Sequence, residues 1–170
     1  MNAKLTSIIF AASALPSLAS ACWEQAARKY SVSTDLLKAV ARAESSLNPR
    51  AVNRSHFAKT KTVDIGIMQV NTDHKVLRNL GVTADQLLDP CTNIHAGARI
   101  LSEKMARYGR TWEAVGAYNA SCVTMTVQQC LRVRARYAWR VYRYLMAGSA
   151  PAVSMVRGAP RASIVHVRLG

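Results

Sequence analysis

The sequence predicts an all-α or α-dominated α+β fold with a small irregular or β segment around residues 50–71. Apolar residues recur at helical spacing along most of the chain, whereas two-residue alternation is rare and runs of β-branched residues are short. Residues 50–71 are the exception, because their periodicity is weak, and they are expected to hold a loop or a small strand pair. We find no internal repeat, and a length of 170 residues favours one domain.

The first two helices are expected near the N-terminus. A short helix covers residues 23–30. Ser33 is a plausible N-cap for a second helix, which runs to Ser45 and ends at Asn48-Pro49, because the residue before a proline disfavours helical backbone.

Capping residues mark the helices of the second half. Thr83 and Gln86 have the spacing of a capping box. Thr92 opens a long helix that Gly109 closes, and Thr111 opens a helix over residues 112–119. A last helix is expected over residues 127–145. The apolar faces of the two longest helices consist of Ile94, Ala98, Leu101 and Met105 in the first and Tyr137, Val141 and Leu145 in the second.

The composition excludes two classes of protein. Half of the residues (50%) are hydrophobic, which excludes a wholly disordered chain. No run of 18 apolar residues occurs in the body of the chain, which excludes a polytopic membrane protein. Lys and Arg number 23 against 9 Asp and Glu, so the net charge of +14 calls for an anionic partner: nucleic acid, a membrane surface or an acidic polymer.

The N-terminus has the form of an export signal. Lys4 provides a positive start, residues 5–18 are apolar or small, and Ala19-Ser20-Ala21 has the small-x-small form of a cleavage site. The alternative is a buried N-terminal helix. We expect residues 1–21 to be a signal peptide and the mature chain to act in the periplasm, which argues against nucleic acid as a partner.

The tail and the core divide the charge unequally. Residues 147–170 are rich in Ala, Ser, Gly and Pro and are expected to form a flexible basic tail. Residues 22–146 form the expected core. Nineteen basic residues and all nine acids lie there, so the core carries a net charge of +10.

An exported chain with an even number of cysteines predicts disulfides. Three pairings are possible among Cys22, Cys91, Cys122 and Cys130. Cys122 and Cys130 are close in sequence and bracket a loop, which leaves Cys22 for Cys91. A lipidated Cys22 is the alternative, although the residues before it lack the usual large aliphatic side chain. A zinc site is disfavoured, because no cysteine pair has short metal-ligand spacing.

One carboxylate occupies an unusual position. Leu37, Val40, Ala41 and Glu44 are spaced i, i+3, i+4, i+7, so a helix puts Glu44 on its apolar face. Glu44 also lies near the helix C-terminus, where the macrodipole disfavours negative charge. Both effects raise the pKa of a carboxyl group, as a general acid requires. The alternative is a solvated Glu44 at the edge of the apolar stripe.

Three short motifs follow in a fixed order: Glu44-Ser45, then Gly66-Ile67-Met68-Gln69, then Ala117-Tyr118-Asn119. In this order they resemble the catalytic domain of the soluble lytic transglycosylases, which have a lysozyme-like fold. Ile67 stands where that family usually has Leu. Tyr137-Ala138 with Val141 looks like the family's last motif. The resemblance extends over residues 22–145.

Within that family the chain looks most similar to the small enzymes that accompany type III secretion, type IV secretion or conjugative pilus systems. The matching features are Cys22-Trp23, the segment 44–49, Asp89-Pro90-Cys91, Asn93-Ile94 and the segment 111–119. Asn119-Ala120-Ser121 departs from the usual Asn-Ala-Gly and is followed by the Cys-bracketed loop. The resemblance implies that components of such an apparatus are partners and that the protein is a monomer without integral membrane association.

The resemblance implies cleavage of the β-1,4 bond between N-acetylmuramic acid and N-acetylglucosamine in peptidoglycan. Glu44 would protonate the glycosidic oxygen and then, as a base, deprotonate the sugar's own 6-hydroxyl, which attacks internally and forms a 1,6-anhydro product. Ser45 would orient the acetamido group. Met68 and Gln69 would line the sugar subsite.

The remaining site residues come from the last two helices. Tyr118 would present a ring face to the sugar and a hydroxyl near Glu44, Asn119 would bond polar groups, and Tyr137 would close the site. Met68, Tyr118 and Tyr137 have the alternative of ordinary core packing. No cofactor or metal is expected, because His56, His74, His95 and His166 are scattered.

Three other functions were weighed. Asp64, or next Asp73, as a second carboxylate would make the enzyme a muramidase that uses water; their alternative is a turn position. A non-catalytic wall-binding assembly module would keep the fold without the chemistry. The third alternative is a cationic protein that acts on membranes.

Overall fold

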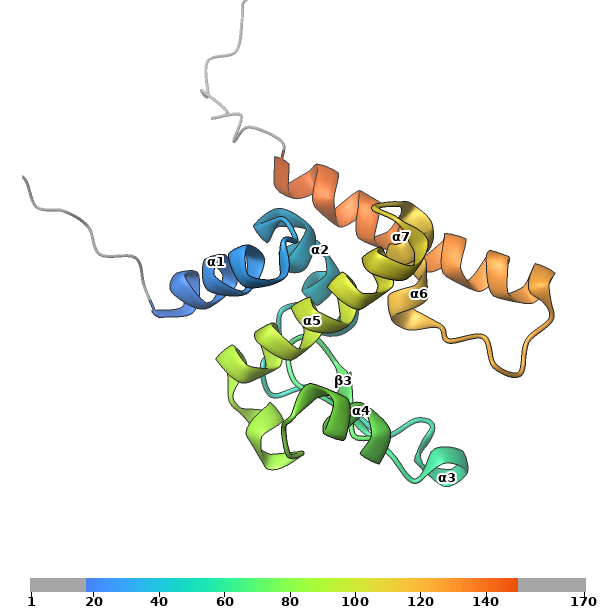
Figure 1. Ribbon diagram of the computed structural model, residues 1–170, viewed down its shortest axis with the longest axis horizontal. Helices are drawn as coiled ribbons and strands as arrows, with labels where there is room; N and C mark the ends of the chain where they lie inside the picture. Colours follow the sequence, from blue (N-terminus) through green and yellow to red (C-terminus); the bar gives the residue numbers. More distant parts are fainter. Residues whose placement is uncertain (1–17, 150–170) are drawn as a thin grey trace, which may run out of the picture.

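The computed structural model describes residues 18–149 and is dominated by helices, as predicted (Figure 1). The elements in chain order are α1 (Leu18–Tyr30), α2 (Thr34–Ser45), β1 (Val52–Asn53), α3 (Phe57–Thr60), β2 (Asp64–Ile65), β3 (Val70–Asn71), α4 (His74–Leu80), the 3-10 turn η1 (Asp85–Leu88), α5 (Pro90–Tyr108), α6 (Trp112–Asn119) and α7 (Val127–Ser149).

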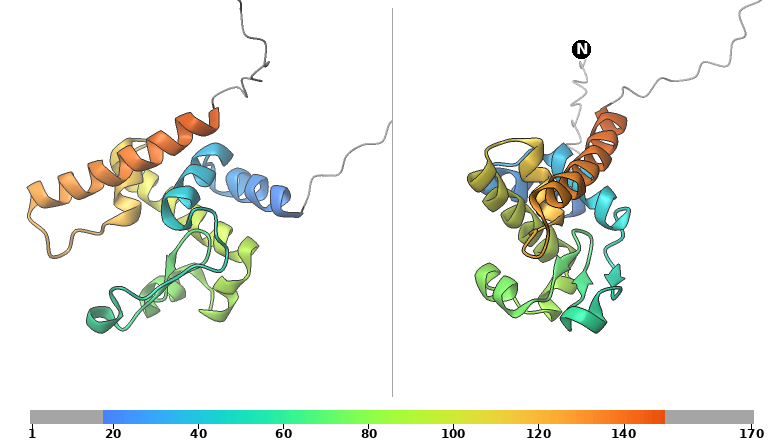
Figure 2. Two further views of the ribbon diagram at one scale, coloured as in Figure 1. Left: turned by 180° about the vertical axis from the view of Figure 1, so that it is seen from behind. Right: turned by 90° about the vertical axis from the view of Figure 1, so that its right-hand side faces the viewer.

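Helix α5 runs through the middle of the molecule (Figure 1) and contacts α1, α6, η1 and β3. Helix α7 packs on both α2 and α6. The strands, α3 and α4 lie together on the other side of the molecule from α7 (Figure 2). The helices supply most of the core, and the sheet and its turn add Ile65, Met68 and Val70 to it.

The core forms where the apolar faces of the helices meet. Leu37 and Val40 from α2, Leu101 from α5 and Val141 from α7 are fully buried. These are the faces that the helical spacing predicted, and their burial supplies the main favourable contribution to folding.

Side-chain caps confirm several expected helix starts. The Leu36 N–H donates to Ser33 Oγ at 3.2 Å, and the Ala114 N–H donates to Thr111 Oγ1 at 3.3 Å. The capping box of Thr83 and Gln86 is present, with reciprocal bonds of 2.9 and 3.3 Å. It leads into the 3-10 turn η1.

One start was placed wrongly. Helix α5 begins at Pro90, and its N-cap is Asp89, whose Oδ1 accepts the Thr92 N–H at 2.8 Å. Proline suits the first turn of a helix because the N–H that it lacks has no partner there. Thr92 is therefore inside the first turn and does not open the helix.

The segment 50–71 contains more structure than expected. Three antiparallel strands pair in the order β1-β2-β3, with Val52 opposite Ile65 and Ile65 opposite Val70. Each strand has two residues, which is too short for an alternating pattern to appear in the sequence. The helical turn α3 lies between β1 and β2.

Helix α4 was not predicted from the sequence. Asp73 is its N-cap, because Asp73 Oδ1 accepts the N–H groups of Lys75 and Val76 at 2.8 and 3.3 Å. Gly81 ends the helix with a φ of 70°. Asp73 therefore has a structural role as a helix cap, which agrees with the alternative that it is a turn residue and not a second catalytic carboxylate.

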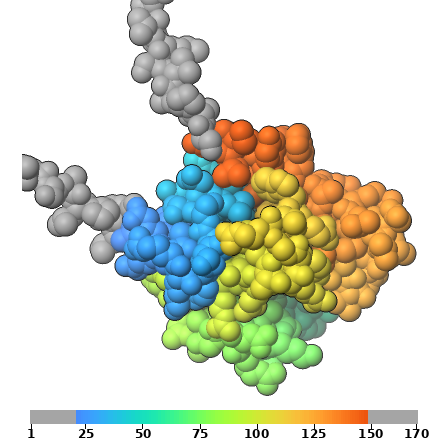
Figure 3. Space-filling view, turned by 45° about the horizontal axis from the view of Figure 1, so that its top comes forward, coloured from blue at the N-terminus to red at the C-terminus, as the bar shows by residue number. Residues whose placement is uncertain are grey.

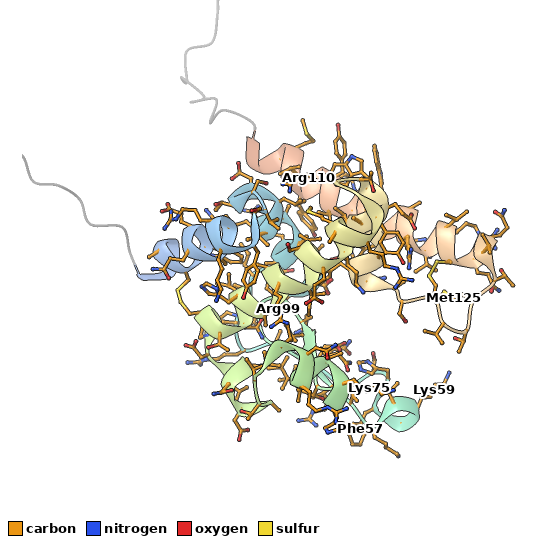
Figure 4. All side chains as sticks on the ribbon, in the orientation of Figure 1. Phe57, Lys59, Lys75, Arg99, Arg110 and Met125 are labelled. Atoms are coloured by element: carbon orange, nitrogen blue, oxygen red, sulfur yellow. A yellow bond between two sulfur atoms is a disulfide. The ribbon has the colours of Figure 1, made fainter. Side chains whose placement is uncertain are left out.

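Both expected disulfides are present. Cys22–Cys91 joins α1 to α5, and Cys122–Cys130 closes the loop between α6 and α7. Figure 4 labels Met125 at the outer end of that loop.

Parts of the expected leader and tail fall outside the described residues, namely 1–17 and 150–170. Residues 18–21 begin α1, and α7 continues to Ser149, past the expected end at Leu145. Within residues 18–149, no helix combines the length and the apolar character needed to cross a bilayer.

Replacing Cys22 and Cys91 together by serine will lower the free energy of unfolding by about 4 kcal/mol, because this bridge closes a separation of 69 residues. The matched control replaces Cys122 and Cys130 together by serine. That bridge closes a separation of only 8 residues, so its loss should lower the free energy of unfolding by about 2 kcal/mol less. Urea denaturation followed by circular dichroism measures both. Equal losses would contradict the entropic explanation.

Candidate active site

Glu44 lies in the last turn of α2 beside a buried apolar face. Leu37, Val40 and Ala41 on that face are fully buried, as the spacing predicted. Burial raises the pKa of Glu44 to about 7. The hydrogen bond from Tyr137 and the charge of Arg140 oppose this rise, and the charge of Asp64 adds to it. The predicted direction is therefore confirmed, and both protonation states are accessible near neutral pH.

Tyr137 reaches Glu44 from α7. Its hydroxyl donates to Glu44 Oε1 at 2.5 Å, and its ring is buried. Burial, followed by the charge of Glu44, raises the pKa of Tyr137 well above its ordinary value. The phenol therefore stays protonated and remains a hydrogen-bond donor to the carboxylate. The guanidinium of Arg140 lies 5.1 Å from the Tyr137 ring centroid.

The turn of residues 66–69 is the point where α2 and α6 meet the sheet. Ser45 Oγ donates to the Ile67 carbonyl at 2.8 Å, and Tyr118 Oη donates to the Met68 carbonyl at 2.8 Å. Burial and the charge of Glu44 raise the pKa of Tyr118 well above its ordinary value. The turn therefore receives one hydroxyl from each helix.

Asn93 on α5 holds the same turn from inside, and sequence reasoning assigned it no role. It is fully buried. Its Oδ1 accepts the Met68 N–H at 2.8 Å, and its Nδ2 donates to the carbonyls of Ile65 at 2.8 Å and Leu87 at 3.0 Å. The usable signal was its i, i+8 spacing to Leu101 on the buried face of the helix.

Two glycines allow this close approach. Gly66 has a φ of 80°, and a Cβ there would overlap the side-chain amide of Asn93. A Cβ on Gly97 would overlap the side chain of Met68. Both positions therefore require glycine.

Gln69 lies at the end of the turn, with a φ of 48°. Its Nε2 donates to the carbonyls of Gly66 at 2.8 Å and Ala51 at 3.2 Å. The amide nitrogen is committed to the protein, so the side-chain oxygen is what Gln69 offers to a ligand.

Asp64 on β2 is the second carboxylate at the site. Asn71 Nδ2 donates to its Oδ1 at 2.7 Å, and Asn53 Nδ2 donates to its Oδ2 at 3.1 Å. His56 Nδ1 lies 3.7 Å from Oδ2. Neighbouring strands thus hold Asp64 in place, which distinguishes it from Asp73 at its helix cap.

A cleft of about 550 Å³ joins these groups. Glu44, Asp64, Gln69, Tyr118 and Asn119 line it, so the structure brings most of the predicted site residues together. Figure 4 labels Phe57 on α3 and Met125 on the α6–α7 loop. His56, which precedes Phe57, and Ser121, at the start of the α6–α7 loop, line the cleft. The other lining residues are Val70, Asn71, Val76, Asn79, Leu80, Ile100, Glu103, Lys104 and Ala117.

One expected side-chain contact is corrected by the structure. Met68 was expected to line the sugar subsite, but its side chain is fully buried and packs near Gly97. What Met68 contributes is backbone, because its carbonyl holds Tyr118 and its N–H is held by Asn93. Ser45 and Tyr137 act from behind the cleft wall, through their bonds to Ile67 and Glu44.

These features define a class of protein. A helical domain, a small antiparallel sheet beside it and a protonatable carboxylate at a polar cleft are the arrangement of lysozyme-like enzymes that cleave glycans. Within residues 18–149, no group of three or more His, Cys, Asp or Glu side chains is placed to hold a metal ion.

The comparisons with known proteins give the family. The Transglycosylase SLT domain family matches residues 21–130. The chain therefore belongs to this family, and the resemblance to soluble lytic transglycosylases is confirmed.

Two of the relatives are 42% identical to this chain over most of their length. It is 42% identical to invasion protein IagB of Salmonella typhimurium over 134 residues, which cover 76% of this chain and 79% of the relative. It is 42% identical to protein IpgF of Shigella flexneri over 124 residues, which cover 72% and 77%.

A solved structure shares the fold. The X-ray structure of an inactive mutant of lytic transglycosylase Slt from Pseudomonas aeruginosa superposes with a TM-score of 0.58 at 20% identity. The match covers 75% of this chain and 23% of that one, so this protein corresponds to about a quarter of Slt.

Replacing Asn93 by alanine will lower the free energy of unfolding by about 3 kcal/mol or more, because it leaves buried backbone groups of Ile65, Met68 and Leu87 unpaired. Urea denaturation measures the loss. Asn48→Ala, at an exposed position, is the control and should cost less than about 1 kcal/mol. A similar small loss for Asn93→Ala would contradict the role given to Asn93.

The stability of the protein will fall with rising pH because of Glu44. The pKa of Glu44 in the folded protein, about 7, exceeds its value in the unfolded chain. The contribution of protonated Glu44 to the free energy of unfolding is therefore fully present below pH 4.5 and is lost as pH rises through 7. Glu44→Gln removes this dependence. The variant should therefore gain up to roughly 3 kcal/mol on the parent between pH 4.5 and 8.

Denaturation of both proteins across that pH range checks the prediction. Glu24→Gln, an exposed carboxylate on α1, is the control and should run parallel to the parent. A Glu44→Gln difference that stays constant with pH would contradict the buried, protonatable Glu44.

Proposed function

We propose that this lytic transglycosylase cleaves the β-1,4 bond between N-acetylmuramic acid and N-acetylglucosamine and leaves a 1,6-anhydro end. The observation that carries the proposal is Glu44, which lies at the cleft with its pKa raised to about 7 and accepts a hydrogen bond from Tyr137. A single carboxyl group that is protonated in part of the population and ionised in the rest suits a reaction in which one group is first acid and then base.

In the first step, protonated Glu44 gives its proton to the glycosidic oxygen, and the bond between that oxygen and the anomeric carbon breaks. The leaving sugar departs as an alcohol, and positive charge develops at the anomeric carbon. The Tyr137 hydroxyl donates to the newly formed carboxylate, which stabilises its negative charge.

In the second step, the Glu44 carboxylate removes the proton from the 6-hydroxyl of the same sugar. The hydroxyl oxygen attacks the anomeric carbon and closes the anhydro ring. No water is consumed, and Glu44 is again protonated. Because the attacking oxygen belongs to the bound sugar, its entropy of positioning is already lost on binding.

The other cleft residues are proposed to hold the substrate. Gln69 presents its side-chain oxygen, and Asn119 lines the same cleft and would bond polar groups of the sugar. Tyr118 offers its ring, since its hydroxyl donates to the Met68 carbonyl. Ser45 does not line the cleft. Its hydroxyl donates a hydrogen bond to the Ile67 carbonyl, so its proposed part is to hold the turn that carries Gln69.

Asp64 favours a second candidate, a muramidase. It lines the same cleft as Glu44, and the amides of Asn53 and Asn71 hold it in place. A carboxylate so placed stabilises positive charge at the anomeric carbon whichever nucleophile follows, so its presence alone fits both reactions. If water reaches the anomeric carbon before the 6-hydroxyl does, the product has a reducing end.

The cellular setting is part of the proposal. Residues 1–21 act as a cleaved signal peptide, residues 22–146 form the periplasmic catalytic domain, and residues 147–170 form a basic tail. The relative IagB is an invasion protein, which supports a role in opening the wall for a secretion or conjugation apparatus. A non-catalytic wall-binding module is disfavoured, because Glu44, Gln69 and Tyr118 are all in place at the cleft.

Digestion of purified peptidoglycan will release fragments with anhydro ends, which mass spectrometry distinguishes from reducing ends by one water molecule. Glu44→Gln should lower turnover by about 10²- to 10⁴-fold, the usual contribution of a general acid. Glu103→Gln, at another carboxylate of the cleft lining, is the matched control and should stay near the parent.

Two results would contradict the proposal. Reducing ends from the parent would establish the muramidase. Unchanged turnover by Glu44→Gln would show that another group is the acid, and Asp64→Asn would then be the next variant to measure.

A further inference from the structure

Three aromatic side chains form an exposed ledge where α6 meets α7. Trp139 and Tyr142 stack, with ring centroids 5.2 Å apart and an interplanar angle of 20°. Trp112 meets Tyr142 edge to face at 5.4 Å. Trp139 is 61% exposed and Trp112 is 44% exposed. These three residues, the aromatic ledge, border a hollow of about 350 Å³ that Glu113, Ala135 and Ala138 complete.

The aromatic ledge is separate from the catalytic cleft. Tyr137 is buried and bonds to Glu44, whereas Trp139 follows two residues later. Two residues advance a helix by more than half a turn, so Trp139 faces away from Glu44. None of the ledge residues lines the cleft. Figure 3 shows the yellow segment that contains α6 beside the orange α7 at the molecular surface.

Exposed cations border the ledge. Arg136 and Arg143 stand three residues before and four residues after Trp139 on α7, and both are exposed. Residues at these spacings are neighbours on one helix face. The acid of the hollow, Glu113, is paired with Arg134 at 2.6 Å. The ledge therefore combines flat apolar ring faces with positive charge.

This combination matches a sugar polymer that carries carboxylates. The face of an aromatic ring is electron-rich and attracts the weakly positive C–H groups of a sugar ring. Trp139 stacks on Tyr142 through one ring face and is 61% exposed, so its outer face is a flat surface available to a sugar ring. The lactyl and stem-peptide carboxylates of peptidoglycan match the guanidinium groups of Arg136 and Arg143.

We propose that the aromatic ledge is a second binding site for a peptidoglycan glycan strand, distinct from the catalytic cleft. The identity of the polymer rests on the proposed function. Binding at the ledge keeps the enzyme on the wall while the cleft releases one product and takes up the next strand. Two weak sites on one polymer give a higher overall affinity than either site alone.

Co-sedimentation of the full chain with protease-treated sacculi tests this site. All proteins carry Glu44→Gln, so that the sacculi stay intact. Adding Trp139→Ala should weaken binding by about tenfold, and Trp139→Phe should retain most of it. Tyr144→Ala, which removes a partly exposed aromatic ring (37%) of the same helix outside the ledge, is the matched control and should bind like the Glu44→Gln parent.

A second pair of variants tests the charge. Arg136→Gln with Arg143→Gln should weaken binding at low salt and reduce its dependence on salt concentration. Thermal melting of each variant confirms that it folds, since the substituted side chains lie at the surface. A salt dependence equal to that of the parent would contradict the proposal that Arg136 and Arg143 bind the carboxylates of the polymer.

Unchanged binding by Trp139→Ala would overturn the proposal. A loss seen only with sacculi that still carry attached protein would also overturn it, because the ledge would then bind a protein. Fragment release by the chain with Glu44 intact is measured on the same sacculi. If fragments are released but Trp139→Ala binds like its parent, the ledge site is contradicted and the proposed reaction stands. If Trp139→Ala binds more weakly but no fragments are released, the ledge site is supported and the proposed reaction is contradicted.

Discussion

The side-chain amide of Asn93 is the contact on which the geometry of the site depends. It is fully buried on the central helix α5 and bonds to the backbone of Ile65, Met68 and Leu87. The turn of residues 66–69 is thereby fixed to α5, and its outward carbonyls hold Ser45 from α2 and Tyr118 from α6. A buried polar group that satisfies several backbone partners at once is costly to disturb. A shift of this turn would therefore displace both helices that carry the cleft residues.

The second constraint is electrostatic, and it concerns one carboxyl group. Burial alone would favour a permanently neutral Glu44, while Tyr137 and Arg140 favour its charged form. The balance puts its pKa at about 7, so neither form is strongly preferred at neutral pH. Tyr137 can play this part because its own pKa is raised by burial, which keeps its proton available for the hydrogen bond. The α2–α7 contact therefore contributes directly to the acid–base behaviour of the site.

Sequence reasoning succeeded where the determining interactions are local. Ser33 and Thr111 cap their helices through bonds within three residues, and the spacing of Glu44 on an apolar face predicted its raised pKa. It failed where the outcome depends on tertiary contacts. Met68 belongs to a recognisable motif, but a motif does not state which way a side chain points, and Gly97 provides the space that buries it. Asn93 was missed because its three partners come from segments distant in sequence, and the two-residue strands were too short to give a pattern.

The large positive charge of the core is compatible with a partly protonated Glu44 because of where the cations lie. A buried carboxyl group beside many cations would have a lowered pKa, yet burial prevails at Glu44, and Arg140 is the cation identified as opposing it. Arg136 and Arg143 lie on exposed positions of α7, where water and salt screen their charges over about 10 Å. Such cations attract an anionic polymer to the surface without setting the protonation of a buried group. Helix α7 therefore has two electrostatic roles on two different faces. Its buried face carries Tyr137, which affects the pKa of Glu44, and its exposed face carries the arginines that we propose bind peptidoglycan.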